Sequence, residues 1–530
     1  AAGCGAGAGF GAGAAGCVLA ARLTEDPGTQ VLLLESGGSD RRLTIAMPAA
    51  IPFVYQNKAL GWNEMAGPEP YLAGQMIDEK RGRVLGGSTS VNAMIFNRGN
   101  ARDFDGWAAQ GLSGWGWQDV LPYFRRMENF AEGASPTRGG DGPLKVTRAN
   151  AAHPLFEVYM RSGEQAGHAR PADHNSGDQE GMHIAQCTIG NGRRWNAAQA
   201  FLRPALGRPN LALKTGVDVE RVLFDGTRAA GVLSADGTRL EASREVILAA
   251  SNIGAAKLLL LSGVGPADEL RALGIPVVLD QPHVGRNLEN HPGVNLQYAA
   301  RREDTLVSQL GLVGQARLGL EWLLFRRGLG ASNFFEAGAF VKTHDGADYA
   351  NLQLEFLPLA RRVVNGKVTV FPGFQLWMDL SRPHSRGFLR LRSANPADAP
   401  QIVFNHLQHR EDQLDMIRAV RLARELFAQP AWEGIRGAEV NPTADLQTDD
   451  DILGWIKSAV GTSYHPSGAT RMAVRPQDGV VDVDCRVHGL EGLRVVGPGV
   501  MPRITTGNLS APTYMIAEKI SDVLRGRRAI

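Results

Sequence analysis

The chain has 530 residues, of which 44% are hydrophobic, and its 56 Lys and Arg nearly balance its 54 Asp and Glu. This length predicts two domains, or one large domain with a second built from insertions. The balanced charge argues against a nucleic-acid partner, and the absence of a run of about 18 apolar residues argues against a membrane-spanning helix.

The cysteines give no sign of a metal centre. Cys4, Cys17, Cys187 and Cys485 form no C-x-x-C pair, so neither a thiolate metal site nor a disulfide framework is expected. No basic segment followed by a long apolar run is visible near the start of the sequence, so a cytoplasmic location is expected.

The first informative segment is a glycine-rich loop between a short strand and a helix. Gly11, Gly13 and Gly16 have the G-x-G-x-x-G spacing, and "AAGCVLAARLTED" after them reads as a helix with small residues. The next strand, "QVLLLES", ends at Glu35, about 20 residues after the third glycine, where an acid can bind a ribose. Together these features predict a dinucleotide whose pyrophosphate lies at the helix N-terminus.

The segment before the loop fits this interpretation poorly. A first strand normally carries large apolar side chains, whereas "AAGCGAGAGF" over residues 1–10 alternates small residues that bury little surface. Three interpretations remain open, namely a thin first strand, a glycine-rich tail and an altered segment.

Later segments alternate between strands and helices. "LALKTGVDVERVLFDGTRAAGVLS" and "EVILAA" predict strands, as do "NLQLEFLPL" and "FQLWMDLS" in the middle of the chain. "EDQLDMIRAVRLARELFAQ" predicts a long helix, and "GLRVV" followed by "APTYMIAEKISDVLRGR" predicts a last strand and a closing helix.

A second glycine-rich segment carries a family resemblance. "GRVLGGSTSVNAMIFNRGNARDFDGW", residues 82–107, is by composition a Gly/Ser loop, but it resembles the first signature of the glucose–methanol–choline (GMC) oxidoreductases, flavin enzymes that act on alcohols. Other segments resemble the family in family order, among them "VGRNLENH", "HSRGFLRLRSANP" and "SYHPSGATRM". "GASNFFEAGAF", "RVHGLEGLRVV" and "ITTGNLSAPTYMIAEKI" are similar to the bacterial choline dehydrogenase branch and to dehydrogenases for other alcohols.

The resemblance implies a mixed α/β fold. A Rossmann-like FAD domain is expected from discontinuous segments, with a substrate domain built on a mostly antiparallel sheet and helices. The expected boundaries are 1–150, 196–295 and 461–530 for the FAD domain, 151–195 for a connecting segment on the substrate side, and 296–460 for the substrate domain.

The resemblance also implies a set of FAD-binding residues. A covalently attached flavin would need a histidine at position 91, and Val91 cannot form that bond, so FAD is expected to be non-covalent. The expected cofactor-binding residues are Gly11, Gly13, Ala14, Ala15, Glu35, Ser36, Arg83, Gly87, Ser88, Val91, Asn92, Ala93, Val219, Pro498, Asn508, Pro512 and Thr513.

Two polar residues near the end of the chain are the catalytic candidates. From spacing alone His465 is a turn histidine, and nothing pairs it with Asn508. Oxidation of an alcohol by a flavin moves a hydride to N5 while a base takes the hydroxyl proton, and a neutral His suits this task near pH 7. By resemblance, His465 is the expected base and Asn508 the group that orients the alcohol oxygen.

Substrate recognition is predicted less specifically. Glu336 is either an ordinary acid at a strand end or a carboxylate for a cationic substrate such as choline. Asn333 and Tyr464 are further candidates for the substrate side, and Phe334 or Phe335 offers an aromatic face.

Two later segments depart from the family pattern. In residues 251–256, Ser251 and Asn252 replace Gly and Ala, and two alanines replace Ser/Thr and Pro. In residues 497–499, Gly-Pro-Gly replaces Asp-Ala-Ser. These changes, with residues 1–10, predict either a weaker or redox-shifted flavin site or a variant segment.

The expected function is oxidation of a primary alcohol to an aldehyde, as in choline dehydrogenases, with electrons passing to a quinone or another acceptor. Alternatives are an aliphatic or polyether alcohol dehydrogenase, an oxidase that uses oxygen, and a flavin-containing lyase similar to hydroxynitrile lyases. The resemblance also allows peripheral contact with the inner membrane.

Overall fold

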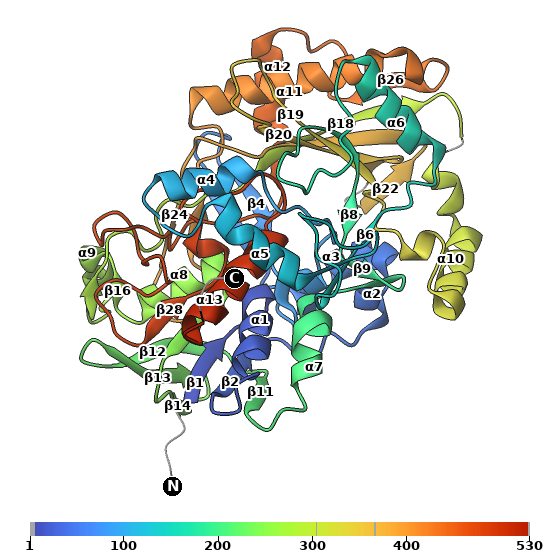
Figure 1. Ribbon diagram of the computed structural model, residues 1–530. Coiled ribbons are helices and arrows are strands. Elements are labelled where there is room, and N and C mark those ends of the chain that lie inside the picture. Colours follow the sequence, from blue (N-terminus) through green and yellow to red (C-terminus); the bar gives the residue numbers. More distant parts are fainter. Residues whose placement is uncertain (1–5, 304, 365–366, 528–530) are drawn as a thin grey trace.

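Parallel strands form the sheet that carries the glycine-rich loop. The computed structural model describes residues 6–303, 305–364 and 367–527 (Figure 1). The sheet has the order β11-β2-β1-β15-β28, all neighbours being parallel. Its strands are β1 (Ala6–Phe10), β2 (Gln30–Glu35), β11 (Leu211–Thr215), β15 (Val246–Leu248) and β28 (Leu493–Val495).

The thin first strand lies at the centre of this sheet. Ala6–Phe10 pairs with β2 along its length and with β15 over its last three residues. The interpretation as a tail is therefore wrong for residues 6–10, while residues 1–5 lie outside the described part. The apolar sequences of β2 and β15 supply buried side chains, and strand pairing needs only the backbone of β1.

A second, antiparallel sheet lies above the first in Figure 1. Its order is β26-β18-β23-β20-β19-β7, and β27 (Gly461–Thr462) also pairs with β18. The strands are β26 (Arg436–Asn441), β18 (Pro292–Ala300), β23 (Gly373–Leu380), β20 (Leu352–Leu357), β19 (Ala337–Val341) and β7 (Gly181–Ile184). The predicted mixed α/β fold with an antiparallel substrate sheet is thus confirmed.

Helices cover one face of the antiparallel sheet. α6 (Pro154–Gln165), α11 (Arg410–Ala428) and α12 (Asp449–Ala459) pack on it (Figure 1). The strands alternate accordingly, because successive side chains point to opposite faces. In β20, Leu352, Leu354 and Phe356 are fully buried, while Gln353 and Glu355 point to the other face.

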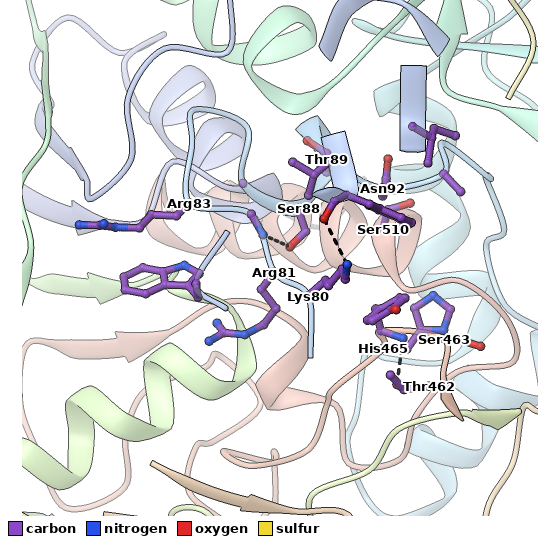
Figure 2. Close-up of a pocket in the computed structure, with 18 of the residues that line it drawn as sticks. Lys80, Arg81, Arg83, Ser88, Thr89, Asn92, Thr462, Ser463, His465 and Ser510 are labelled. Atoms are coloured by element: carbon purple, nitrogen blue, oxygen red, sulfur yellow. Dashed lines mark hydrogen bonds between the residues drawn. The ribbon is translucent and has the colours of Figure 1, made fainter. Parts of the chain in front are cut away.

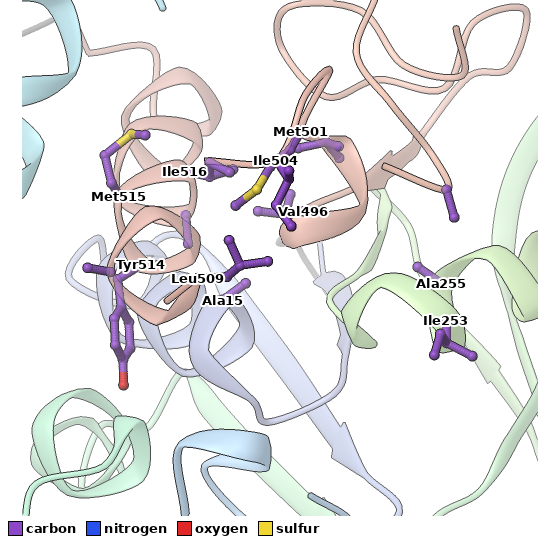
Figure 3. Packing of buried hydrophobic residues seen from close by; sticks show 14 of the residues in the cluster. Ala15, Ile253, Ala255, Val496, Met501, Ile504, Leu509, Tyr514, Met515 and Ile516 are labelled. Carbon is purple, nitrogen blue, oxygen red and sulfur yellow. The ribbon is translucent and has the colours of Figure 1, made fainter. Parts of the chain in front are cut away.

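The C-terminal helix closes the first domain. α13 (Ser510–Leu524) packs on α1 (Ala14–Leu23) and on α5 (Trp117–Met127), with Ala15, Leu509 and Ile516 in the packed core (Figure 3). Glu518 is fully buried and forms ion pairs with Arg22 and Arg126, so one carboxylate of α13 joins both helices.

The two sheets draw their strands from separated parts of the chain. The parallel sheet takes strands from within the predicted segments 1–150, 196–295 and 461–530, and β18 begins four residues before the predicted boundary at 296. The domain boundaries themselves stay predictions. None of the helices in the described part of the chain is long and apolar enough to cross a membrane.

Candidate active site

A cavity of about 2020 Å³ lies between the two sheets. Its walls come from the carboxyl ends of the parallel strands, where α/β sheets bind ligands, and from the polar face of the antiparallel sheet. Figure 2 shows Lys80, Ser88, Asn92 and His465 around this pocket. Its volume exceeds the 300–1,000 Å³ typical of small-ligand pockets, so it can hold a dinucleotide together with a substrate.

The glycine-rich loop forms part of the cavity wall. Each of its three positions suits a glycine for a different steric reason. A Cβ on Gly11, whose φ is +90°, would lie 2.6 Å from the oxygen of Ala249, and a Cβ on Gly16 would lie 1.9 Å from the oxygen of Gly11. A Cβ on Gly13 would meet no atom closer than the Cα of Gly87, at 3.9 Å. The backbone can therefore be approached closely at Gly13.

The first turn of α1 is suited to bind an anion. Gly13 is the N-cap, so no side chain satisfies the first backbone amides, and the first turn contains no acid. These free amides and the helix dipole together attract phosphate. The structure thus fits the pyrophosphate of a dinucleotide at α1.

Glu35 lies at the end of β2, as the spacing predicted. Its carboxylate accepts hydrogen bonds of 2.8 Å from the amides of Ala12 and Gly37. Burial raises the pKa of Glu35, and the two amide hydrogen bonds oppose this shift. The carboxylate is therefore held rigidly at the cavity wall, where each oxygen keeps capacity for a ribose hydroxyl.

The first-signature segment is held by a buried arginine. Arg194 donates from Nη1 to the carbonyl oxygen of Asn92 at 2.6 Å and to its Oδ1 at 2.8 Å. Asn333 donates to the carbonyl oxygen of Ala93 at 2.7 Å. These contacts fix the backbone beside Val91, which lines the cavity.

His465 and Asn508 meet in the cavity. Asn508 Oδ1 accepts from Asn97 Nδ2 at 2.7 Å and from Gln353 Nε2 at 3.0 Å. The Asn508 amide nitrogen therefore faces His465, with Nδ2 3.2 Å from Nε2. Because an amide nitrogen only donates, Nε2 of His465 carries the lone pair. The ring proton is then on Nδ1, 2.9 Å from Nδ1 of His291.

One asparagine aligns the two histidines. Asn290 Oδ1 accepts from the backbone amides of His465 at 2.8 Å and His291 at 2.9 Å. Asn290 Nδ2 donates to Thr462 at 2.7 Å. The backbone under both rings is thus fixed by one side chain.

Burial keeps the imidazole of His465 neutral. It lowers the pKa of His465 to about 3, because the surroundings disfavour the charged ring. The pKa of His291 is lowered for the same reason. Near pH 7 His465 therefore presents an unprotonated Nε2 to the cavity, as a general base requires.

The structure brings most of the predicted residues to this cavity. His465, Asn508, Tyr464 and Asn333 line it, as do the predicted cofactor residues except Pro512, which is buried in the first turn of α13. The lining cofactor residues are Gly11, Gly13, Ala14, Ala15, Glu35, Ser36, Arg83, Gly87, Ser88, Val91, Asn92, Ala93, Val219, Pro498 and Thr513.

Glu336 is not among the lining residues. It is buried, and its carboxyl interacts with the Ser332 side chain and the Ala151 amide, while burial raises its pKa. Glu336 directly precedes β19, and it does not line the cavity. The interpretation as an ordinary acid at a strand end fits this placement.

Sequence reasoning missed several residues of the site. His291 lies in the quoted segment "VGRNLENH", but nothing in that segment indicated contact with His465. Glu355 and Trp377 lie on predicted strands, and the alternation of polar and apolar residues there could have pointed to them. Lys80, Arg81 and Lys257 add positive charge to the cavity wall. In the described residues, no cluster of His, Cys, Asp or Glu could hold a metal.

The two unusual segments contact each other. Residues 251–256 begin α8 (Ser251–Leu261), and a Cβ on Gly499 would lie 3.2 Å from Oδ1 of Asn252 and 2.6 Å from Oγ1 of Thr470. Asn252 Oδ1 also accepts from the Ala469 amide at 2.9 Å. A larger residue at 252 and a glycine at 499 therefore compensate each other sterically.

Ser251 is strained where a glycine would not be. Its φ is +63°, in the left-handed region. We expect Ser251→Gly to raise the free energy of unfolding by about 0.5–1 kcal/mol, since only glycine adopts this conformation without a steric penalty. Urea unfolding at matched flavin content measures this change. Ser251→Ala, which keeps the Cβ, should bring no such gain, and an equal gain from both variants would contradict the explanation.

Comparison with known proteins identifies relatives over nearly the whole chain. Two family models, both described as GMC oxidoreductase, match residues 10–293 and 383–517. The oxygen-dependent choline dehydrogenase of Brucella canis is 45% identical over 517 residues, covering 97% of this chain and 94% of its own. That of Paraburkholderia phymatum is 44% identical over 521 residues, covering 97% and 91%.

Solved structures share the fold. Pyridoxine 4-oxidase from Mesorbium loti superposes with a TM-score of 0.89 at 28% identity, covering 98% of this chain and 99% of its own. A variant of Aspergillus oryzae RIB40 formate oxidase superposes with a TM-score of 0.91 at 24% identity, covering 98% of both chains, and supports the fold alone.

Proposed function

The chain belongs to the GMC oxidoreductase family and acts on CH–OH donors, and from this premise we propose that it is an FAD-dependent dehydrogenase that oxidises a primary alcohol to an aldehyde. The observation that carries this proposal is the contact between His465 and Asn508 inside the cavity that also receives the glycine-rich loop. The 45% identity to oxygen-dependent choline dehydrogenases supports an alcohol of the choline class.

In this proposal His465 and Asn508 bind the hydroxyl group of the substrate. The substrate hydroxyl donates its proton to Nε2 of His465, and the amide of Asn508 donates to the oxygen as negative charge develops there. His291 accepts from Nδ1 of His465 and so stabilises the protonated ring. A flavin bound in the cavity supplies the acceptor for the hydride of the carbinol carbon.

The cavity residues suggest how FAD is held. The free amides of α1 bind the pyrophosphate, and Glu35 binds the ribose hydroxyls. Val91 and Asn92 line the cavity and would contact the flavin in this arrangement, and a valine has no group that could bond covalently to it. FAD is therefore proposed to be non-covalent.

A second candidate function, that of an oxidase, differs from the first in the electron acceptor. A dehydrogenase passes electrons to a quinone or another carrier, whereas an oxidase passes them to oxygen. The use of oxygen is favoured by two comparisons, since the relatives at 44–45% identity are named oxygen-dependent and the superposed structure at 28% identity is an oxidase.

An anaerobic titration tests the proposed function. The holoprotein is mixed with a panel of primary alcohols that includes choline, and the flavin absorbance should bleach with at least one of them. Air is then admitted, and a peroxide yield matching the aldehyde formed would favour the oxidase. A holoprotein that no alcohol bleaches would overturn the proposal.

We also propose peripheral contact with a membrane. The support for it is the exposed apolar surface of α10 (Leu312–Phe325). Leu312, Val313, Leu324 and Phe325 are each more than half exposed on this helix, and Leu318 of the same helix lines the cavity. Exposed apolar side chains on one helix suit the surface of a bilayer. The cytoplasmic location also stays a prediction.

A further inference from the structure

The antiparallel sheet presents a polar face to the cavity beside His465. Glu355 of β20 pairs with Trp377 of β23, and Gln353 pairs with Asp379. Because residues two apart share a face, these four side chains lie on the same side of the sheet. Gln375, two residues before Trp377, shares this face, and Glu355, Trp377 and Gln375 line the cavity.

Two hydrogen-bond acceptors on this face, Gln375 Oε1 and the Glu355 carboxyl group, have unused capacity. Oε1 of Gln375 has no hydrogen-bond partner, although the residue is only 3% exposed. Glu355 accepts from Gln353 Nε2 at 3.0 Å, and within the described residues no cation lies within 4 Å of its carboxyl group. A buried acceptor left unpaired costs about 1–3 kcal/mol, so a ligand that donates would relieve this cost.

The neighbouring carboxyl group is already satisfied. Asp379 Oδ2 accepts from Ser463 Oγ at 2.8 Å and from Trp377 Nε1 at 3.2 Å. Burial is the main cause of the raised Glu355 pKa, and repulsion by the nearby Asp379 carboxyl group is the second. A positive charge in the cavity would oppose both effects, and Glu355 is the carboxyl that lines it.

Glu355 also lies close to the group that holds the alcohol. Gln353 Nε2 donates both to Glu355 Oε1 and to Asn508 Oδ1, each at 3.0 Å. The Asn508 side chain also interacts directly with the Glu355 carboxyl group, so this carboxyl group adjoins the proposed alcohol-binding amide. A cation bound by Glu355 must therefore be only a few bonds from the hydroxyl group.

We propose that Glu355 and the carbonyl oxygen of Gln375 select a short amino alcohol whose protonated nitrogen carries at least one N–H. This inference rests on the proposed function and names its substrate class. The carboxylate compensates the charge, and the N–H donates either to the carboxylate or to the otherwise unpaired Oε1 of Gln375. A quaternary ammonium such as that of choline supplies the positive charge but no N–H donor, and a neutral alcohol supplies neither.

The test measures kcat/KM of the holoenzyme for choline, 2-(dimethylamino)ethanol and 1-butanol. The tertiary amino alcohol, which has one N–H when protonated, should exceed choline about 10-fold and 1-butanol about 100-fold, as expected where a site hydrogen-bonds its substrate. Glu355→Gln should remove the preference over 1-butanol. Glu336→Gln is the matched control, since that carboxyl group does not line the cavity, and it should keep the preference.

The pH dependence gives an independent readout. Burial, followed by Asp379, raises the pKa of Glu355 to about 8, so a cation binds best once this proton is lost. For the amino alcohol kcat/KM should rise with pH toward about 8, and Glu355→Gln should abolish this rise. The other titratable or charged groups around Glu355 are Asp379, Cys187, Tyr55, Tyr464, His465 and Arg361.

Binding without oxidation separates this inference from the proposed function. N,N-dimethylethylamine has no hydroxyl group, and its binding can be followed by perturbation of the flavin absorbance. The native holoprotein should bind it about 10-fold more tightly than Glu355→Gln does, even if no alcohol is oxidised. Equal binding by both, or a choline rate that matches or exceeds the amino alcohol rate, would overturn the inference.

Discussion

Replacement of His465 by alanine is expected to slow flavin reduction by an alcohol about 10²- to 10⁴-fold, the range that a general base contributes. Nε2 of His465 is the unprotonated nitrogen that faces the amide of Asn508, and the low pKa of the ring keeps it in this form. Alanine removes the acceptor for the hydroxyl proton. Anaerobic stopped-flow absorbance measures the rate of bleaching directly.

The flavin content separates a catalytic loss from a binding loss. His465→Ala should retain FAD, because the glycine-rich loop and Glu35 are untouched. His488→Ala is the matched control: this histidine contacts the carbonyl oxygen of Ala473 and does not line the cavity. If His465→Ala reduced the flavin as fast as His488→Ala does, His465 would not be the base.

Replacement of Gly13 by aspartate is expected to abolish FAD binding while leaving the fold intact. The nearest atom to a Cβ at this position is 3.9 Å away, and Asp is a favoured N-cap residue, so α1 should keep its stability. The carboxylate would occupy the free amides of the first turn and repel the pyrophosphate. The flavin-to-protein absorbance ratio after reconstitution measures the loss.

A second glycine provides the matched control. Gly207 is exposed, does not line the cavity, and has no atom within 4 Å of an added Cβ. Gly207→Asp should bind FAD as the native chain does, and urea unfolding of the apoproteins should give similar midpoints for all three. Normal FAD content in Gly13→Asp would place the pyrophosphate elsewhere.

Local patterns predicted the elements around the glycine-rich loop. The loop, the helix after it and Glu35 lie within 25 residues, and their geometry follows from glycine sterics and helix amides. The thin first strand misled because its pairing with β2 and β15 needs only its backbone. That information is not contained in residues 6–10.

The substrate half depends on contacts between distant segments. His291 and His465 are 174 residues apart, and the pairing of β18 with β27 and the hydrogen bonds of Asn290 bring their backbones together. Glu336 and Glu355 are both acids near strands, and the sequence favoured the one in the family-like segment. Strand register decides between them, because it turns Glu355 toward the cavity and leaves Glu336 against Ser332.

The central claim is that this chain transfers hydride from a carbinol carbon. The most direct test compares anaerobic flavin reduction by 2-(dimethylamino)ethanol and by the same alcohol deuterated at the carbinol carbon. We expect the flavin to bleach with both and more slowly with the deuterated alcohol, because breaking the C–H bond limits the step. A flavin that stays oxidised with every alcohol offered, or an equal rate with both isotopologues, would contradict the claim.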